Sequence, residues 1–454
     1  MARKTNRDDG EGSLLIRGGR VIDPANGIDD LRDVLVRGAR ISAVTDPGKS
    51  DYAVGSNGRV FDATGCCVTP GFIDLHVHLR EPGQSYKESI ATGTAAAAAG
   101  GFTSVCTMPN TMPVNDSPEI TRWIRAPQRR ALVNVFPVAA ATLGSRGDKL
   151  SDLASLQRAG AIAISDDGKP ILRDEMMEKA LRGAAALNMP VVQHAEDTRL
   201  TAGAAMNEGA VAFRLGLRGM PAEAESRIVE RDIALARRTG AQLHVAHIST
   251  AAALQAVRRA KSEGLRITCE VTPHHFVLGD EALLDPQYRE YEANLKMNPP
   301  LRATADRQAM VEGLADGTID AIATDHAPHA AHEKQVEFES SAFGITGVET
   351  ALGLTIARLH EEHKISLTRI VELLAAAPAR IFHLDTAPQF GEARGALNPG
   401  WTADITIFDA ARDWTFRLRD SLSKSRNSPF DGWKLRGKVV ATVVAGRMVY
   451  QERR

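Results

Sequence analysis

Histidines and a neighbouring arginine end one apolar stretch of the sequence with a spacing that suits metal chemistry. The stretch GFIDLHVHLREPG separates His76 from His78 by one residue and places Arg80 two residues further on. In an extended strand, residues two apart face the same side, so we expect the three side chains to share one location. An imidazole pair with this spacing can chelate a cation, and the alternative is a pair of polar core histidines bonded to carbonyl groups.

Other apolar stretches end in further nitrogen and oxygen donors. VVQHAED offers His194, HVAHIST offers His247, AIATDHAPH offers Asp325, and AISDDG offers Asp166 or Asp167. Four histidines and two aspartates at one place are enough to hold two adjacent metal ions. A donor set without a thiolate suits zinc and also admits manganese or cobalt. A buried hydrogen-bond network is the alternative for the whole set.

The phase of the residues within a strand selects between neighbouring candidates. Small residues are in phase with Asp167 and bulky isoleucines are in phase with Asp166, so we expect Asp167 to point into a crowded interior. His247 is nearer the strand end than His244 and out of phase with it. We therefore expect His247 to be the ligand and His244 to be structural.

The elements that must position these residues are strands that alternate with helical stretches rich in alanine, leucine, arginine and glutamate. This alternation predicts βα units on a parallel sheet. Eight apolar runs favour a (β/α)8 barrel over a doubly wound sheet, and seven of them become polar at their carboxyl ends, where such barrels assemble their chemistry. The runs are GFIDLHVH, FTSVCTMPN, LVNVFPVAA, AIAISDD, PVVQHAE, QLHVAHIS, RITCEVTPHH and AIATDHAPH.

Both ends of the chain lack the strand–helix alternation of the middle and consist of short strand-like runs separated by turn residues. We expect them to form one small β-sandwich domain into which the barrel is inserted. The predicted division is a flexible tail at 1–13, the first part of the β domain at 14–67, the barrel at 68–390 and the second part of the β domain at 391–454.

Composition excludes several classes of function. The net charge of −1 gives no argument for nucleic acid or a membrane surface as a partner. Four cysteines without C-x-x-C spacing do not suggest a disulfide framework, and the polar start leads into no apolar signal segment. We expect a cytoplasmic protein.

Taken together, the motifs resemble those of the dihydroorotases in the amidohydrolase superfamily, in the bacterial type with an aspartate at the fourth strand. The motifs are GFIDLHVHLREPG, TMPNT, SDDG, QHAED, HVAHIST, KMNPPLR and ATDHAPH, and the resemblance runs from about Leu14 to Tyr450. Many members of the superfamily bridge two metal ions with a carboxylated lysine. Here Lys169 comes only after the strand, so the resemblance does not extend to that bridge.

The resemblance implies a role for each matching residue. His76, His78 and Asp325 would hold one ion, His194 and His247 a second, and Asp167 would bridge them, with one or two Zn²⁺ per chain. Asp325 would also be the catalytic acid and base. The implied substrate contacts are His78, Arg80, Asn110, Asn298, His329 and the backbone near Phe343 and Gly344.

The implied reaction is the reversible cyclisation of N-carbamoyl-L-aspartate to (S)-dihydroorotate in pyrimidine biosynthesis, with Arg80 gripping the substrate carboxylate. We expect residues 330–347 to form a mobile lid. Relatives suggest a homodimer or a complex with aspartate carbamoyltransferase. The rival interpretations are a hydantoinase, dihydropyrimidinase or allantoinase, which usually carry the lysine bridge, and an inactive scaffold for the carbamoyltransferase, which typically has lost metal ligands.

Overall fold

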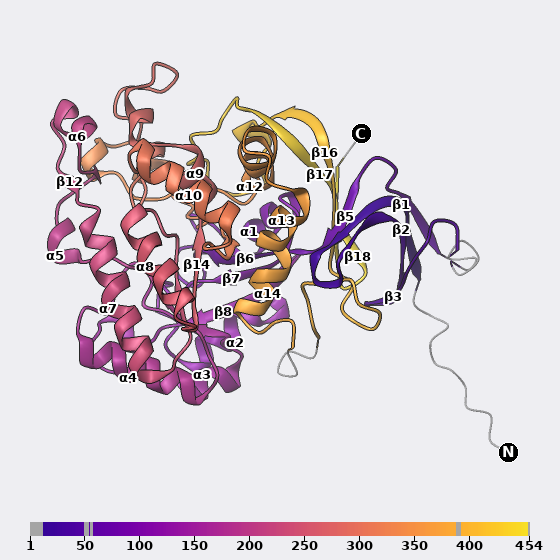
Figure 1. Ribbon diagram of the computed structural model, residues 1–454, viewed down its shortest axis with the longest axis horizontal. Helices are drawn as coiled ribbons and strands as arrows, with labels where there is room; N and C mark the ends of the chain where they lie inside the picture. The colour runs from indigo at the N-terminus through magenta and orange to yellow at the C-terminus, as the bar shows by residue number, and fades with distance from the viewer. Residues whose placement is uncertain (1–11, 50–53, 55–57, 387–391, 453–454) are drawn as a thin grey trace.

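The computed structural model describes residues 12–49, 54, 58–386 and 392–452. They form a large α/β barrel and a smaller β domain, which occupy opposite sides of Figure 1. Most of the predicted tail at 1–13 lies outside the described residues, and the first strand already begins at Ser13.

Eight parallel strands form the barrel sheet and follow one another in chain order. They are β6 (Phe72–Val77), β7 (Phe102–Thr107), β8 (Asn134–Ala139), β9 (Ala163–Ile164), β10 (Val191–Gln193), β13 (Leu243–Val245), β14 (Ile267–Val271) and β15 (Ala321–Ile322). All eight lie in the apolar runs from which the barrel was predicted. The ring closes just after β15, where His326 forms a parallel bridge with Val77. The His326 carbonyl oxygen accepts a hydrogen bond from the His78 amide at 2.9 Å. The predicted barrel is confirmed.

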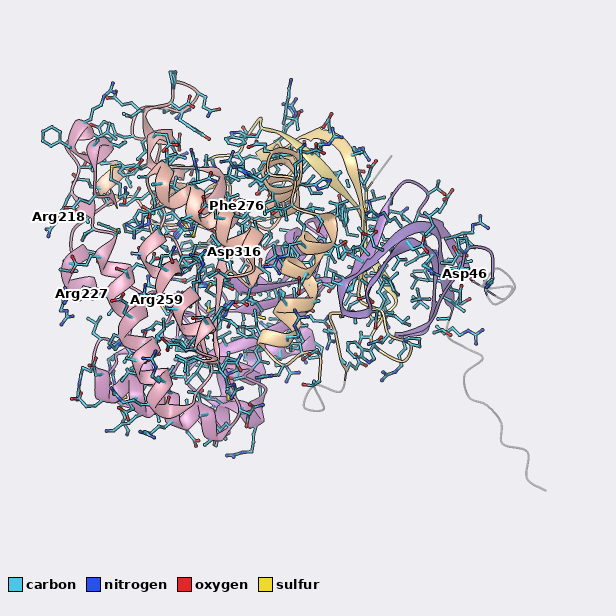
Figure 2. All side chains as sticks on the ribbon, in the orientation of Figure 1. Asp46, Arg218, Arg227, Arg259, Phe276 and Asp316 are labelled. Atoms are coloured by element: carbon cyan, nitrogen blue, oxygen red, sulfur yellow. The ribbon has the colours of Figure 1, made fainter. Side chains whose placement is uncertain are left out.

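Helices connect successive strands and cover the outside of the barrel. They are α1 (Ile90–Ala99), α2 (Pro118–Arg125), α3 (Leu153–Ala159), α4 (Asp174–Ala186), α7 (Glu223–Thr239), α8 (Ala251–Ser262), α10 (Thr304–Asp316) and, after β15, α12 (Ala351–Thr355). In α7, Ile228, Val229 and Ile233 recur at helical spacing and are buried, so one face packs on the sheet. Figure 2 shows Arg227 on α7 and Arg259 on α8 at the outer surface.

Shorter elements lengthen the connections at the carboxyl ends of the strands. They are α5 (Thr198–Thr201), β11 (Met206–Asn207), α6 (Ala210–Leu215), β12 (Gly219–Met220), α9 (Pro273–Val277) and α11 (Ala331–Lys334). Two more short helices, α13 (Leu367–Val371) and α14 (Ala377–Ile381), follow α12, and the Ile381 carbonyl oxygen accepts from Gln242 just before β13. Among the described residues, no helix combines the length and the apolar character needed to cross a bilayer.

The smaller domain is a sheet built from both ends of the chain, seen in Figure 1 as indigo and yellow strands lying together. Strand β5 joins the two halves because it runs parallel to β1 and antiparallel to β16, with Thr69 opposite Thr406. The apolar core of this domain contains residues from both ends of the chain, for example Ile16 and Val443. The strands are β1 (Ser13–Asp23), β2 (Ile28–Arg37), β3 (Arg40–Thr45), β4 (Arg59–Asp62), β5 (Cys67–Pro70), β16 (Ile405–Thr415), β17 (Lys434–Val444) and β18 (Arg447–Gln451). The prediction of one small β domain from both termini is confirmed.

Candidate active site

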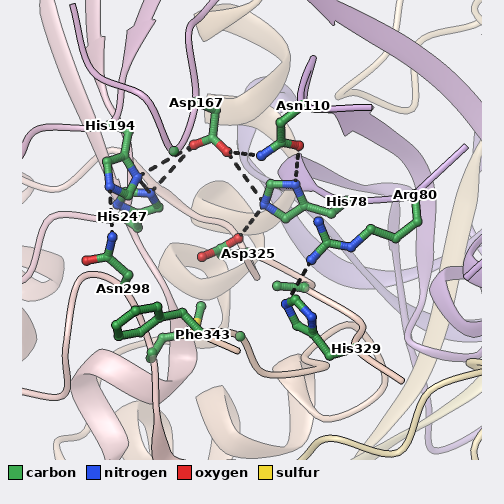
Figure 3. A pocket seen from close by; sticks show the side chains of 14 residues that line it. His78, Arg80, Asn110, Asp167, His194, His247, Asn298, Asp325, His329 and Phe343 are labelled. Carbon is green, nitrogen blue, oxygen red and sulfur yellow. Dashed lines mark hydrogen bonds and ion pairs between the residues drawn. The ribbon is translucent and has the colours of Figure 1, made fainter. Parts of the chain in front are cut away.

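The polar residues that end the barrel strands gather around one cavity of about 270 Å³ at the mouth of the barrel (Figure 3). All the residues predicted for the site line this cavity except His76, which is fully buried beneath it. The lining residues that were predicted are His78, Arg80, Asn110, Asp167, His194, His247, Asn298, Asp325, His329, Phe343 and Gly344.

The six predicted metal ligands form overlapping groups in which the ligand atoms lie within 4.8 Å of one another. The groups are His76, His78 and Asp167; His76, His247 and Asp325; and Asp167, His194 and His247. Their shared members make one continuous cluster.

Distances place Asp167 between the two halves of the cluster. Its Oδ1 lies 3.3 Å from His76 Nε2 and 3.7 Å from His194 Nδ1. On one side, His78 Nε2 is 2.9 Å from Asp325 Oδ1, and on the other, His194 Nδ1 is 3.0 Å from His247 Nε2. A carboxylate in this position can reach an ion on either side.

The electrostatics of the cluster fit a bound cation. His76 Nε2 is buried without a hydrogen-bond partner among the described residues, although Asp167 and Asp325 lie within 3.6 Å. Burial opposes protonation of His76, but the two carboxylates outweigh it and raise its pKa well above the usual value. Burial likewise opposes ionisation of Asp167, yet His76 and His194 hold its pKa well below the usual value. The site therefore favours positive charge between its carboxylates, which a divalent ion supplies without protons on the imidazoles.

The structure separates the neighbouring candidates that the sequence offered. Asp166 turns away from the cluster and accepts from the Thr142 amide at 3.0 Å, while Asp167 points into the cluster. His244 is absent from the metal-ligand groups, and its Nδ1 lies 2.8 Å from Thr268 Oγ1.

Backbone geometry at the strand ends helps to aim three of the side chains. Arg80, His247 and Asp325 have positive φ angles of 60°, 29° and 45°, a region that residues other than glycine rarely occupy. Such conformations cost free energy and persist where the surrounding structure fixes them, which is common at functional sites.

The expected substrate contacts surround the cluster. Arg80 Nε donates to the Pro328 carbonyl oxygen at 3.0 Å and its NH2 lies 3.2 Å from His329 Nε2, so NH1 is left facing the cavity. Burial and then the nearby Arg80 lower the pKa of His329 to about 2, so its ring is neutral and can accept from the guanidinium. Asn110 donates to Asp167 Oδ2 at 2.9 Å, and its Oδ1 lies 2.9 Å from His78 Nδ1.

Gly344 is required by the close approach of two chain segments. Its φ is +146°, and a Cβ there would lie 2.7 Å from the Ala327 carbonyl oxygen and 2.9 Å from His329 Cδ2. A side chain at this position would displace the His329 ring from the cavity wall.

Two carboxylates beside the ligands were not predicted. Glu270 on β14 is 1% exposed and lies 3.2 Å from both His76 Nδ1 and His244 Nε2. Glu196 lies 3.0 Å from His194 Nε2 and accepts from Asn298 Nδ2 at 2.9 Å. Carboxylates in these positions fix the orientation of ligating imidazoles. The available signal for Glu270 was a lone acid within an apolar strand.

Solved structures that resemble this one share its fold at low sequence identity. An L-hydantoinase (dihydropyrimidinase) from Arthrobacter aurescens superposes with a TM-score of 0.84 at 23% identity, covering 97% of this chain and 96% of that one. A dihydropyrimidinase from Brevibacillus agri gives 0.80 at 24% identity, covering 97% and 95%. At this identity the likeness establishes the barrel with its attached β domain and leaves the activity open.

Sequence comparison is more specific. Residues 65–253 match a family model described as dihydro-orotase-like. A dihydroorotase from Citrifermentans bemidjiense is 49% identical over 97% of this chain and all of its own length. Another from Anaeromyxobacter dehalogenans is 48% identical over 97% of this chain and 98% of its own. The chain therefore belongs to the dihydroorotase family of metal-dependent cyclic amide hydrolases.

Proposed function

We propose that this protein is a dihydroorotase, which reversibly cyclises N-carbamoyl-L-aspartate to (S)-dihydroorotate and water in de novo pyrimidine biosynthesis. The observation that carries the proposal is Arg80, a buried guanidinium facing the same cavity as the metal-ligand cluster. Both substrates bear a carboxylate beside the reacting amide, and an arginine fork binds a carboxylate through parallel hydrogen bonds.

The proposed metal ligands are His76, His78, Asp167, His194, His247 and Asp325. A cation held there would polarise the substrate carbonyl and lower the pKa of water, which is the chemistry that amide hydrolysis needs near neutral pH. Asn110 supports this arrangement because its amide contacts both Asp167 and His78.

Proton transfer is assigned to Asp325. In ring opening, water oxygen adds to the ring amide carbon, Asp325 accepts the proton that water loses, and that proton passes to the ring nitrogen as the C–N bond breaks. In ring closure, the carbamoyl nitrogen attacks the carbon of the protonated side-chain carboxyl group and loses a proton to Asp325; Asp325 passes that proton to the departing hydroxide, which leaves as water as the C–O bond breaks. Asp325 Oδ1 lies 2.9 Å from His78 Nε2, which keeps the carboxylate at the centre of the mouth.

Orientation of the substrate is assigned to Arg80, Asn110, Asn298, His329 and the backbone of Phe343 and Gly344. Fixing the reacting groups in place removes part of the entropic barrier to reaction. The neutral ring of His329 holds one edge of the Arg80 guanidinium and leaves the other edge for the substrate carboxylate.

Hydantoinase activity is the rival that the fold alone allows. Two observations oppose it: the fourth strand supplies Asp167, with Lys169 exposed outside the cluster, and Arg80 has no carboxylate to bind in hydantoin or dihydrouracil. The test is turnover of dihydroorotate, hydantoin and allantoin by the same protein before and after chelation. Turnover of dihydroorotate alone, lost on chelation and restored by metal, is expected. Preferred turnover of hydantoin would overturn the assignment.

Two finer statements belong to the proposal. The donor set of imidazoles and carboxylates supports zinc, at one or two ions per chain, and elemental analysis of purified protein tests this. We also propose a cytoplasmic enzyme that forms a homodimer or assembles with aspartate carbamoyltransferase. Size-exclusion chromatography with and without that enzyme distinguishes these states.

A further inference from the structure

Phe343 and Gly344 line the substrate cavity, and Figure 3 shows Phe343 beside it; both belong to the segment 338–346, which we call the wall segment. From the sequence, the surrounding stretch at 330–347 was expected to be a mobile lid. In the structure, the main-chain carbonyl groups of this wall segment are held by three buried side chains from three different parts of the chain: Lys296, Lys334 and Asn427.

Lys296 donates three hydrogen bonds from its ammonium group to the backbone of residues 338–341. Its Nζ donates to the carbonyl oxygens of Phe338, Glu339 and Ser341, each at 2.8 Å. The side chain is 2% exposed, and its Nζ lies 4.4 Å from the centre of the Phe343 ring. The Lys296 carbonyl oxygen also accepts from the Gly344 amide at 3.0 Å.

Lys334 holds the next part of the wall segment. Its Nζ donates to the carbonyl oxygens of Ala342 at 2.8 Å and Gly344 at 3.0 Å, and the residue is 6% exposed. Burial, and then the nearby Lys296, lower its pKa to about 7. Placing two ammonium groups against carbonyl groups in the interior is costly, so their presence favours a role in setting the shape of this segment.

Asn427 comes from the connection between β16 and β17, far away in sequence. Its Nδ2 donates to the carbonyl oxygens of Ala327 at 2.9 Å and Gly344 at 3.0 Å. Its Oδ1 accepts from the His329 amide at 2.9 Å. One amide side chain thus fixes His329 and Gly344 relative to each other, at the point where a Cβ on Gly344 would collide with the His329 ring.

We propose that Lys296, Lys334 and Asn427 are positioning residues that hold 338–346 as a fixed wall of the substrate cavity and set the place of His329 within it. None of the three belongs to the metal-ligand groups. They act on the position of the substrate through the backbone groups that they contact. The inference rests on the proposed function for its kinetic part alone.

The experiment compares Asn427→Asp and Lys296→Met with the matched control Asn134→Ala. Asn427→Asp keeps the shape and the acceptor for His329 but replaces the donor to two carbonyl groups. Asn134 is an equivalent amide at the amino end of β8, where it donates to the Thr103 carbonyl oxygen and to Asp404, both at 2.9 Å. The readouts are hydrogen–deuterium exchange of peptides spanning 338–346 without substrate, metal content, and KM and kcat for dihydroorotate.

We expect hydrogen–deuterium exchange of 338–346 to quicken at least tenfold in Asn427→Asp and in Lys296→Met. In both variants KM should rise about tenfold, kcat should change less, and metal content should stay unchanged. Asn134→Ala should alter neither readout. Unchanged exchange and a KM within twofold of wild type in folded Asn427→Asp would overturn the inference, even if Lys296→Met fails to fold. An equal rise in KM in Asn134→Ala would overturn it too. Wild-type protein without dihydroorotate turnover would instead count against the proposed function, while the exchange measurement still decides this inference.

Discussion

Replacement of Arg80 by methionine tests whether the site recognises the substrate carboxylate. Nε donates to the Pro328 carbonyl oxygen and one hydrogen of NH2 is used by His329, so NH1 and the second hydrogen of NH2 remain for a forked contact with the ligand. A hydrogen bond between charged groups contributes about 1.5–3 kcal/mol, and a forked pair at the upper end of this range gives about 3 kcal/mol. Since 1.36 kcal/mol corresponds to a factor of ten, kcat/KM for dihydroorotate should fall about 150-fold.

The assay separates recognition from general damage to the mouth of the barrel. Arg80→Met also leaves the Pro328 carbonyl oxygen and His329 without their partner, which would disturb any ligand. We therefore compare kcat/KM for dihydroorotate with the inhibition constant of dihydrouracil, the same ring without the carboxylate. The inhibition constant of dihydrouracil should change less than threefold. Arg80→Lys keeps the charge but loses the forked contact, so its kcat/KM for dihydroorotate should lie between the values of wild type and Arg80→Met. Equal losses for both ligands would refute the assignment.

Further outcomes follow from the same geometry. Asp325→Asn should lose turnover by at least a hundredfold with metal content retained, and near-normal turnover would end its role in proton transfer. Glu270→Gln should weaken metal binding tenfold to a hundredfold in a competition titration with a chelator, because Glu270 holds His76 Nδ1; an unchanged affinity would contradict this. Burial raises the pKa of Asp232 from 3.8 to about 6, so its stabilising contribution is complete below pH 3.8 and is lost as pH rises through 6. Between pH 4 and 7, the unfolding free energy of wild type should fall relative to Asp232→Asn by about 2.4 kcal/mol in denaturation experiments, and a difference that does not vary with pH would contradict this account.

Local rules account for the fold and for the choice among the candidate ligands. The alternation of strands and helices and the polar carboxyl ends of the strands predicted the barrel, and the eight strands are found where expected. The two-residue period of a strand favoured Asp167 over Asp166, and position at the strand end favoured His247 over His244. These inferences need only the chain within a few residues of each side chain, and the structure now gathers the chosen residues in one cluster.

Contacts between distant segments had to come from the tertiary structure. Glu270 contacts His76 across the barrel, and Asn427 reaches Gly344 from a connection that follows the barrel in sequence. The lid at 330–347 was expected to be mobile because this stretch after the eighth strand contains glycine, while the contacts of Lys296, Lys334 and Asn427 with its carbonyl groups are recognisable only in space. Spacing along a strand is fixed by backbone geometry, so the sequence by itself determines which side chains point inward. The partner that each one meets depends on how the strands close into a ring and on where the C-terminal segment returns, which the packing of the whole chain decides.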